Sequence, residues 1–90
     1  MIKFEIKDGV AIIPEGTTVI GRGAFRGCNS LSIIALPSSV MIIEDGAFYL
    51  CELRAIRYGG TIEQCYARYR NWGADFYNKK ISCTDGDVEI

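Results

Sequence analysis

The segment between residues 13 and 58 contains the same sequence pattern twice, and this repetition constrains the fold more than any other feature. The first copy begins at Ile13 and the second at Leu36, so corresponding residues lie 23 positions apart. Identical pairs at this spacing are Pro14/Pro37, Ile20/Ile43, Gly23/Gly46, Ala24/Ala47, Phe25/Phe48 and Cys28/Cys51. Beyond the cysteines the spacing falls to 22, as between Ile34 and Ile56. A period of this length is typical of a solenoid, whose units bury their apolar faces only by stacking on one another.

Each copy contains short β-strand signals separated by turn residues. Val19–Ile20 and Val40–Ile43 are predicted to be short strands, and the Gly-Ala-Phe sequences at 23–25 and 46–48 are predicted to turn a corner. A further strand in each copy has apolar residues that are expected to point inward: Leu31, Ile34 and Leu36, then Leu53, Ile56 and Tyr58. Phe25 and Phe48 should stack on each other as large interior side chains.

The segment before the repeats is predicted to be a β-hairpin. Ile2–Lys7 and Val10–Ile13 flank Asp8-Gly9, which is a strong hairpin signal. The outer strand would cover the open amino end of the repeats and block edge-to-edge pairing.

The segment after the repeats is predicted to contain a helix and a second hairpin. Residues 61–64 read Thr-Ile-Glu-Gln, a helix capping box. Apolar residues then recur at helical spacing and predict a buried stripe: Ile62, Cys65, Tyr66, Tyr69 and Trp72. Lys80–Cys83 and Asp87–Ile90 are predicted to pair across residues 84–86.

The two copies resemble the BspA-like leucine-rich repeat family, whose pattern is roughly Ile-Pro-x-x-Val-x-x-Ile-Gly-x-x-Ala-Phe-x-x-Cys-x-x-Leu-x-x-Ile-x-Leu. The matching residues are Pro14, Ile20-Gly21, Ala24-Phe25, Cys28, Leu31, Ile34 and Leu36-Pro37, then Val40, Ile43, Ala47-Phe48, Cys51, Leu53 and Ile56. Thr17 replaces the usual valine, and the Cys51–Leu53 spacing is one residue short.

The carboxy-terminal third resembles the segment that often closes such arrays. The residues that carry this likeness are Tyr58-Gly59-Gly60-Thr61, Trp72 and Cys83-Thr84-Asp85-Gly86, with Cys65 where the family commonly has tryptophan. The resemblance implies a β-rich α+β fold, a short leucine-rich-repeat solenoid of two repeats of about 23 residues. We expect a single domain over residues 1–90, with an amino-terminal hairpin cap (1–13), two repeats (14–58) and a carboxy-terminal helix-plus-hairpin cap (59–90).

Composition argues against several function classes. The sequence has no histidine, which is the commonest acid/base group and metal ligand, and its net charge of −1 gives no reason to expect nucleic acid or a membrane as partner. We therefore expect no enzyme activity, no cofactor and no metal site. The cysteines Cys28, Cys51, Cys65 and Cys83 form no Cys-x-x-Cys motif, and Cys28 and Cys51 are expected to be buried free thiols. Whether Cys28 and Cys51 form a disulfide stays open.

The predicted function is a protein–protein interaction module of the kind that the resemblance implies, as an intracellular inhibitor or adaptor. Relatives with this pattern are associated with surface adhesion and partner binding and occur in bacterial and phage genomes. If alternate strand residues point inward, the outward residues form two columns across the strands. These columns are Val10, Ile33 and Ala55, and Ile12, Ala35 and Arg57. Such an apolar patch favours a partner-binding surface, unless the amino-terminal segment or the cap folds over it and makes it core.

Two other functions stay open. The chain could self-associate as a homo-oligomer or act as a surface-adhesion fragment, because two repeats are fewer than the roughly three that stabilise a solenoid. Alternatively it could bind carbohydrate or nucleic acid through aromatic residues of the cap, namely Tyr66, Tyr69, Trp72 and Tyr77. The amino terminus carries no signal-peptide pattern, which predicts a cytoplasmic protein. An extracellular protein whose leader had been removed would have the same sequence.

Overall fold

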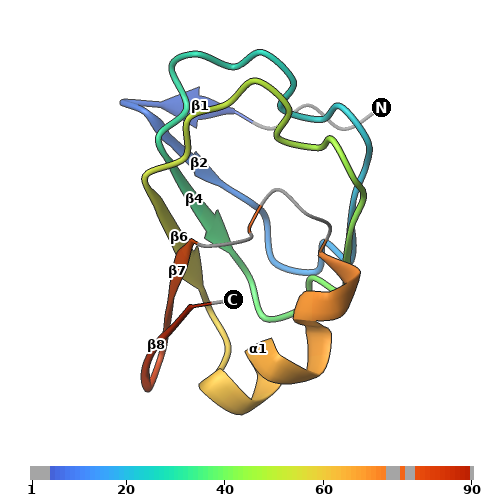
Figure 1. Cartoon of the computed structure of the whole chain (residues 1–90), viewed down its shortest axis with the longest axis vertical. Coiled ribbons are helices and arrows are strands. Elements are labelled where there is room, and N and C mark those ends of the chain that lie inside the picture. Colours follow the sequence, from blue (N-terminus) through green and yellow to red (C-terminus); the bar gives the residue numbers. More distant parts are fainter. Residues whose placement is uncertain (1–4, 73–75, 77–78, 90) are drawn as a thin grey trace.

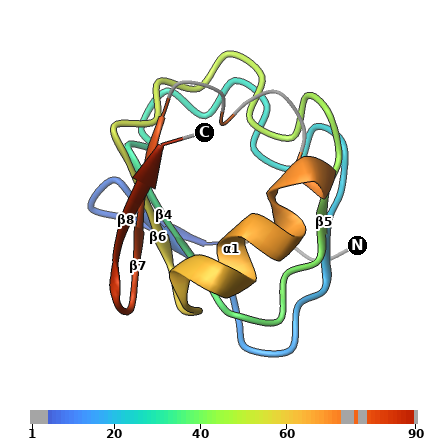
Figure 2. The same ribbon diagram turned by 60° about the horizontal axis from the view of Figure 1, so that its bottom comes forward.

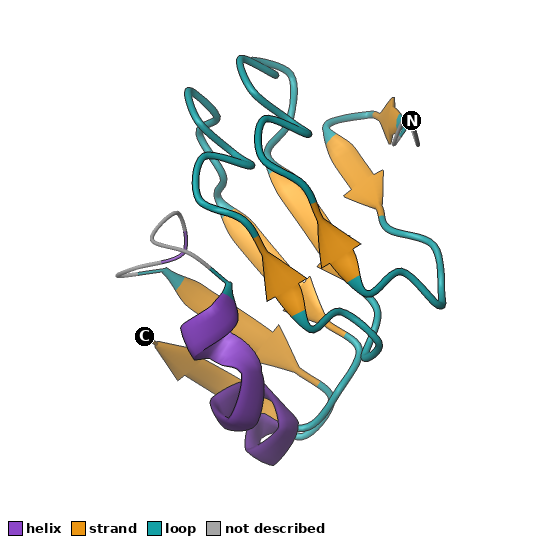
Figure 3. Ribbon diagram, turned by 90° about the vertical axis from the view of Figure 1, so that its right-hand side faces the viewer, coloured by secondary structure: helices purple, strands orange, loops and turns teal. Residues whose placement is uncertain are grey.

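Two β-sheets of unequal size lie on opposite sides of a hydrophobic core, and Figure 1 labels the strands of the larger sheet. The computed structural model describes residues 5–72, 76 and 79–89. The larger sheet has the strand order β1-β2-β4-β6-β7-β8, and the smaller sheet pairs β3 with β5 (Figure 3). The strands are β1 (Ile6–Lys7), β2 (Val10–Ile12), β3 (Val19–Ile20), β4 (Ile33–Leu36), β5 (Ile42–Ile43), β6 (Ala55–Tyr58), β7 (Lys80–Cys83) and β8 (Gly86–Glu89). The helices are α1 (Ile62–Arg68) and the short 3₁₀ helix η1 (Tyr69–Asn71).

The two copies lie side by side in the register that the repeat spacing predicts. Strands β2, β4 and β6 are parallel, and Ile34 on β4 pairs with Ala11 on β2 and Ile56 on β6. Across the core, β3 and β5 are also parallel, with Ile20 beside Ile43. Because counterparts in the two copies lie side by side, two of the identical pairs, Ile20 with Ile43 and Phe25 with Phe48, form buried rows.

The Gly-Ala-Phe corners also stack as predicted. The rings of Phe25 and Phe48 are nearly parallel, at 5° between planes and 5.1 Å between centroids. The Phe25 amide donates to the Ala47 carbonyl at 2.8 Å. The backbones of the two corners therefore lie side by side, as the two rings do. Gly23 and Gly46 have φ of 74° and 81°, a left-handed conformation that glycine adopts without steric cost.

The predicted amino-terminal hairpin is present over the described residues. Strand β1 pairs antiparallel with β2, and Asp8 and Gly9 have φ of 53° and 80°, as a type I′ turn requires. Within the described residues the outer strand begins at Ile6, and residues 2–4 of the predicted strand lie outside them.

In the second copy the strand predicted at 40–43 is shorter than expected. The Val40 amide donates to the Pro37 carbonyl in a turn, so the strand begins only at Ile42.

The carboxy-terminal segment covers one end of the stacked copies, where α1 runs across the ring that they form (Figure 2). The predicted capping box is present: the Gln64 amide donates to the Thr61 hydroxyl at 3.2 Å, and the Thr61 amide donates to the Gln64 side chain at 2.8 Å. From the last turn of α1, Arg68 donates to the Ser38 carbonyl and so ties the helix to the second copy.

Two details of this segment differ from the sequence prediction. Tyr66 was expected in the buried stripe but is 54% exposed, because the short α1 turns only the Cys65 side towards the core. The final turn is tighter than predicted: β8 begins at Gly86, opposite Cys83, so that only Thr84 and Asp85 connect the strands.

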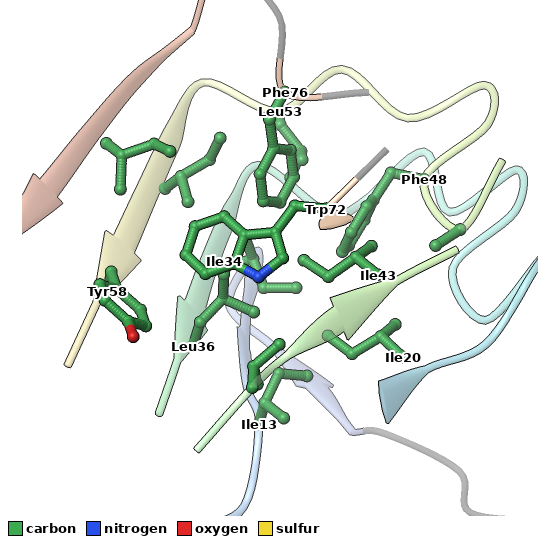
Figure 4. Close-up of a cluster of buried hydrophobic side chains, with 14 of the residues drawn as sticks. Ile13, Ile20, Ile34, Leu36, Ile43, Phe48, Leu53, Tyr58, Trp72 and Phe76 are labelled. Atoms are coloured by element: carbon green, nitrogen blue, oxygen red, sulfur yellow. The ribbon is translucent and has the colours of Figure 1, made fainter. Parts of the chain in front are cut away.

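The centre of the core is aromatic where the copies meet this segment (Figure 4). Trp72 is fully buried and contacts Tyr58 edge-on, with 5.0 Å between centroids. Phe76 lies next to both Trp72 and Phe48, at 6.3 Å and 5.3 Å. In the described parts of the chain no helix is long and apolar enough to cross a membrane.

Candidate functional site

The outward face of the larger sheet brings together the six residues that the sequence singles out. Alternation along the strands buries Ala11, Ile34 and Ile56 and turns their neighbours away from the core. In the resulting register Val10 pairs with Ile33 and Ile33 with Ala55, while Ile12 pairs with Ala35 and Ala35 with Arg57. We call these six residues the sheet-face patch: Val10, Ile12, Ile33, Ala35, Ala55 and Arg57.

The sheet-face patch is exposed at two of its six residues and partly exposed at the other four. Ile12 is 71% exposed, the largest value among the large hydrophobic side chains that the structure describes, and Arg57 is also exposed. Val10, Ile33, Ala35 and Ala55 are half-buried, as expected for small or branched side chains that lean on their neighbours in a sheet. The interpretation that another segment covers this face and makes it core therefore does not hold for Ile12 and Arg57.

Polar residues continue the sheet-face patch on its carboxy-terminal side. Ser82 on β7 lies beside Arg57, and Asp87 on β8 lies beside Ser82. Asp87 also forms an ion pair with Lys80 at 3.1 Å. The hydrogen bond from Lys80, and then that from the Ser82 hydroxyl, lower the pKa of the Asp87 carboxyl. The face thus changes from apolar on β2 and β4 to charged on β7 and β8.

Sequence reasoning missed these polar neighbours because β7 is not a copy of the repeat. Its register depends on the length and path of the segment between α1 and β7, and no periodicity specifies either. The predicted hairpin, with residues 84–86 as its turn, would place Cys83 rather than Ser82 opposite Asp87, so neither the pairing of Ser82 with Asp87 nor the place of Ser82 beside Arg57 was predicted.

A second exposed apolar group lies on the outside of the smaller sheet. Val19 and Ile42 pair across β3 and β5 and are 47% and 44% exposed, and Met41 beside them is 45% exposed. The sequence analysis did not select these residues. The signal was the alternation within each two-residue strand, in which Ile20 and Ile43 are buried and their predecessors are not.

The corners form an open groove of about 520 Å³ lined by Arg22, Gly23, Arg26, Asp45, Gly46 and Tyr49. The Arg26 guanidinium lies 5.6 Å from the centroid of the Tyr49 ring, a cation–π contact that holds both side chains along the groove. Over the described residues, no group of three or more cysteine, aspartate or glutamate side chains is placed to hold a metal ion.

All four cysteines are free thiols. Cys65 is buried, as its place in the predicted helical stripe requires, and Cys83 is half-buried. Cys28 and Cys51 were expected to be buried, but they are only half-buried. Cys28 and Cys51 lie at the ends of corner turns, where the chain reaches the surface, and the Cys51 thiol donates to the Phe25 carbonyl. Burial raises the pKa of the Cys65 thiol to about 12.

The aromatic surface proposed for carbohydrate or nucleic acid is not formed as predicted. Trp72 has no exposed area, so it cannot stack on a base or a sugar without unfolding of the core. Tyr66 is exposed and contacts Tyr69 edge-on, with 6.2 Å between centroids, and Tyr69 is half-buried. Tyr77 lies outside the described residues.

A comparison with models of protein families identifies the repeat region. The model of a family described as the BspA type leucine rich repeat region (6 copies) matches residues 9–71, which include both copies, α1 and η1. No curated protein and no solved structure matches the chain.

Proposed function

Because the chain belongs to the BspA-type leucine-rich repeat family, we propose that it is a non-enzymatic module that binds another protein through the sheet-face patch. Leucine-rich repeats in general mediate protein–protein interactions. The proposal assigns the six residues of the sheet-face patch to the contact surface, and it assigns no catalytic residue.

The proposed architecture is a short solenoid of two repeats (14–58), with an amino-terminal hairpin cap (1–13) and a carboxy-terminal helix-plus-hairpin cap (59–90). The parallel pairing of β2, β4 and β6 supports the stacking. The antiparallel pairs β1–β2 and β7–β8 at the two edges of the sheet support the capping role. A stack of this kind presents one or two residues from each strand on a rigid, continuous surface, which suits recognition of another macromolecule.

The exposure of Ile12, in the same row as Arg57 and separated from it by Ala35, carries the proposal. An apolar side chain that is 71% exposed loses contact with water when a partner covers it, which stabilises the complex. Arg57 ends the same row of residues, and arginine is frequent among the residues that dominate binding energy. A matching partner would present an apolar centre with a carboxylate opposite Arg57. An intracellular inhibitor, an adaptor and an adhesion fragment would all use such a face.

The experiment compares proteins captured from a lysate of the native host by the wild-type chain and by three variants. Ile33→Asp and Arg57→Glu alter the sheet-face patch, whereas Ile42→Asp alters the exposed face of the smaller sheet as a matched control. We expect quantitative mass spectrometry to show proteins that wild type and Ile42→Asp retain and that both patch variants lose. Retention of the same proteins by all four chains, or a specific loss with Ile42→Asp alone, would contradict the proposal.

A second candidate function is self-association through the smaller sheet. The outward side chains of Val19, Met41 and Ile42 form an exposed apolar group, and β3 and β5 pair only with each other among the described strands. Unpaired strand edges next to apolar side chains favour pairing with another copy. Light scattering at micromolar concentration tests this candidate, for which we expect a dimer or larger assembly that Ile42→Asp dissociates. A monomeric mass for the wild-type chain excludes it.

A further inference from the structure

The two corners share one backbone path but carry different exposed side chains. The glycine, alanine and phenylalanine that form the turn are identical in the two copies. The exposed positions beside them differ: Arg22 corresponds to Asp45, and Arg26 corresponds to Tyr49. These four side chains line the same open groove between the stacked corners. The turn itself therefore does not explain which side chains line the groove.

We call this groove the corner groove, and its shape suits a chain that lies across it. Its volume of about 520 Å³ falls in the range of roughly 300–1,000 Å³ that is typical of ligand pockets. Gly23 lines the groove, and a Cβ at this position would meet no described atom within 4 Å, so no neighbouring side chain fills the space beside this backbone. Because the corner groove is open rather than enclosed, an extended peptide fits it better than a small molecule that must be surrounded.

The charges in the corner groove favour a ligand with one negative charge. Two guanidinium groups and one carboxylate line it, those of Arg22, Arg26 and Asp45. The Arg26 guanidinium lies over the exposed Tyr49 ring, 5.6 Å from its centroid, and guanidinium groups bind carboxylates through paired hydrogen bonds. A single carboxylate matches the excess of one positive charge, whereas a doubly charged phosphate would bring its second charge close to Asp45.

Leu50 follows Tyr49 in a conformation that leucine rarely adopts. Its φ is 65°, and its counterpart in the first copy is Gly27, whose φ is 69°. A branched side chain has a steric cost in this left-handed region. Burial does not offset the cost, because Leu50 is 62% exposed. Strained residues are frequent at binding sites, and contact with a ligand would give this exposed leucine a role that folding does not.

We propose that the corner groove binds an extended segment of another protein in which a glutamate or aspartate lies next to an apolar residue. The carboxylate contacts Arg26 and Arg22, and the apolar side chain packs on Tyr49 and Leu50. The corner groove lies on the turns at 22–26 and 45–49, whereas the sheet-face patch lies on β2, β4 and β6. The inference therefore does not depend on the sheet-face patch.

The test titrates isotope-labelled protein with the capped peptide acetyl-Leu-Glu-Leu-amide and follows the amide chemical shifts by NMR. We expect saturable shifts at residues 22–27 and 44–50. The matched peptide acetyl-Leu-Gln-Leu-amide has the same shape without the charge and should bind about tenfold more weakly, because hydrogen bonds to charged groups are stronger than those between neutral groups. The peptide acetyl-Leu-phosphoserine-Leu-amide should bind no more tightly than the glutamate peptide.

A pair of arginine variants tests the charge. We expect Arg26→Gln to weaken binding of the glutamate peptide about tenfold and to leave binding of the glutamine peptide almost unchanged. Arg54→Gln is the matched control, because Arg54 is exposed outside the corner groove and the change removes the same charge from the protein. It should bind both peptides as wild type does.

Leu50→Gly separates a role in binding from a role in folding, because it restores the residue that the first copy has. Glycine adopts the left-handed conformation without steric cost, so we expect a Tm equal to or above that of wild type, together with weaker binding of the glutamate peptide. Leu50→Ala removes most of the side chain but keeps the Cβ. It should bind as weakly as Leu50→Gly and have the lower Tm of the two variants.

Four results would overturn the proposal: shifts that do not saturate or that lie outside the two corners, equal affinity for the glutamate and glutamine peptides, tighter binding of the phosphoserine peptide, or wild-type affinity in Leu50→Gly. Each of these results concerns the corner groove alone. The sheet-face patch is tested separately by the capture experiment, so failure of one proposal is distinguishable from failure of the other.

Discussion

The two repeat copies and the carboxy-terminal segment build the same core in different ways. In the copies each apolar residue packs on its own counterpart, as Phe25 does on Phe48 and Ile34 on Ile56. The carboxy-terminal segment contributes residues without a counterpart, such as Trp72 and Phe76, which cover Tyr58 and Phe48 at the open end of the stack. The two copies extend the core by repeating the same contacts, whereas the carboxy-terminal segment adds residues that occur once.

This difference shows what limits a short repeat protein. Translation leaves an exposed apolar surface at each end, so a chain with few copies depends strongly on the residues that cover these ends. Contacts between the copies repeat from one copy to the next, whereas the side-chain contacts of the carboxy-terminal segment are individual, as between Trp72 and Tyr58. Substitutions that distinguish the two regions therefore test this comparison directly.

The largest effect is expected for Trp72→Ala. Trp72 is fully buried, and its indole Nε1–H has no hydrogen-bond partner within the described residues, so the volume of the ring accounts for its role. We expect the free energy of unfolding to fall by about 3–5 kcal/mol in urea titrations. Tyr66→Ala on the exposed side of α1 is the control, for which we expect a change of less than about 0.5 kcal/mol. Equal losses for the two variants would show that Trp72 does not close the core.

The next effect compares the two stacked phenylalanines. Phe48 has aromatic neighbours on two sides, Phe25 at 5.1 Å and Phe76 at 5.3 Å, and it therefore belongs to both regions. We expect Phe48→Ala and Phe25→Ala each to cost about 3–5 kcal/mol, with the larger loss for Phe48→Ala. Thermal melts of both variants provide the measurement. If both melt within a few degrees of wild type, the stacking of the two copies is wrong.

A smaller effect is expected at the start of α1. Thr61→Ala removes the side chain that accepts from the Gln64 amide, and the loss should be about 1 kcal/mol. Ser39→Ala is the matched change between the copies, where the hydroxyl donates to the Thr17 carbonyl at 2.8 Å. We expect Ser39→Ala to cost less, because the parallel backbone pairing of β3 and β5 continues without it. The reverse order in urea unfolding would contradict the view that individual contacts matter more in the carboxy-terminal segment.

The smallest effect concerns pH and Asp87. Its pKa is lowered in the folded protein by hydrogen bonds from Lys80 and Ser82, so the contribution of its carboxylate to stability is present above the pKa of the unfolded chain. That contribution is lost as the pH falls through the lower, folded pKa. We expect an NMR titration to give the Asp87 carboxyl a pKa below 3.8. We also expect Asp87→Asn to have a slightly lower melting temperature than wild type at pH 7, and no lower melting temperature once the pH is below the folded pKa of Asp87. A titration at or above 3.8 would exclude these hydrogen bonds in solution.

Periodicity explains which features could be predicted from the sequence. The pairing of Ile34 with Ile56 and the Phe25–Phe48 stack follow from a spacing that repeats, because identical residues in stacked units occupy identical places. The outward columns from Val10 to Ala55 follow from the same register and from strand alternation.

Features outside the repeats could not be predicted in the same way. Tyr66 fits helical spacing but is exposed, because an apolar stripe does not specify which of its edges faces the core. The exposed group of Val19, Met41 and Ile42 was missed because strands of two residues are too short for alternation to be recognised.

The most direct measurement compares Ile33→Asp with Ile34→Asp by urea unfolding and circular dichroism. The two residues are adjacent on β4, but Ile33 lies in the sheet-face patch and Ile34 has no exposed area. We predict that Ile33→Asp keeps the wild-type spectrum and a cooperative transition, whereas Ile34→Asp is unfolded because it would bury an unpaired carboxylate. If Ile33→Asp unfolds to the same extent as Ile34→Asp, residue 33 belongs to the core and the sheet-face patch is not a binding surface.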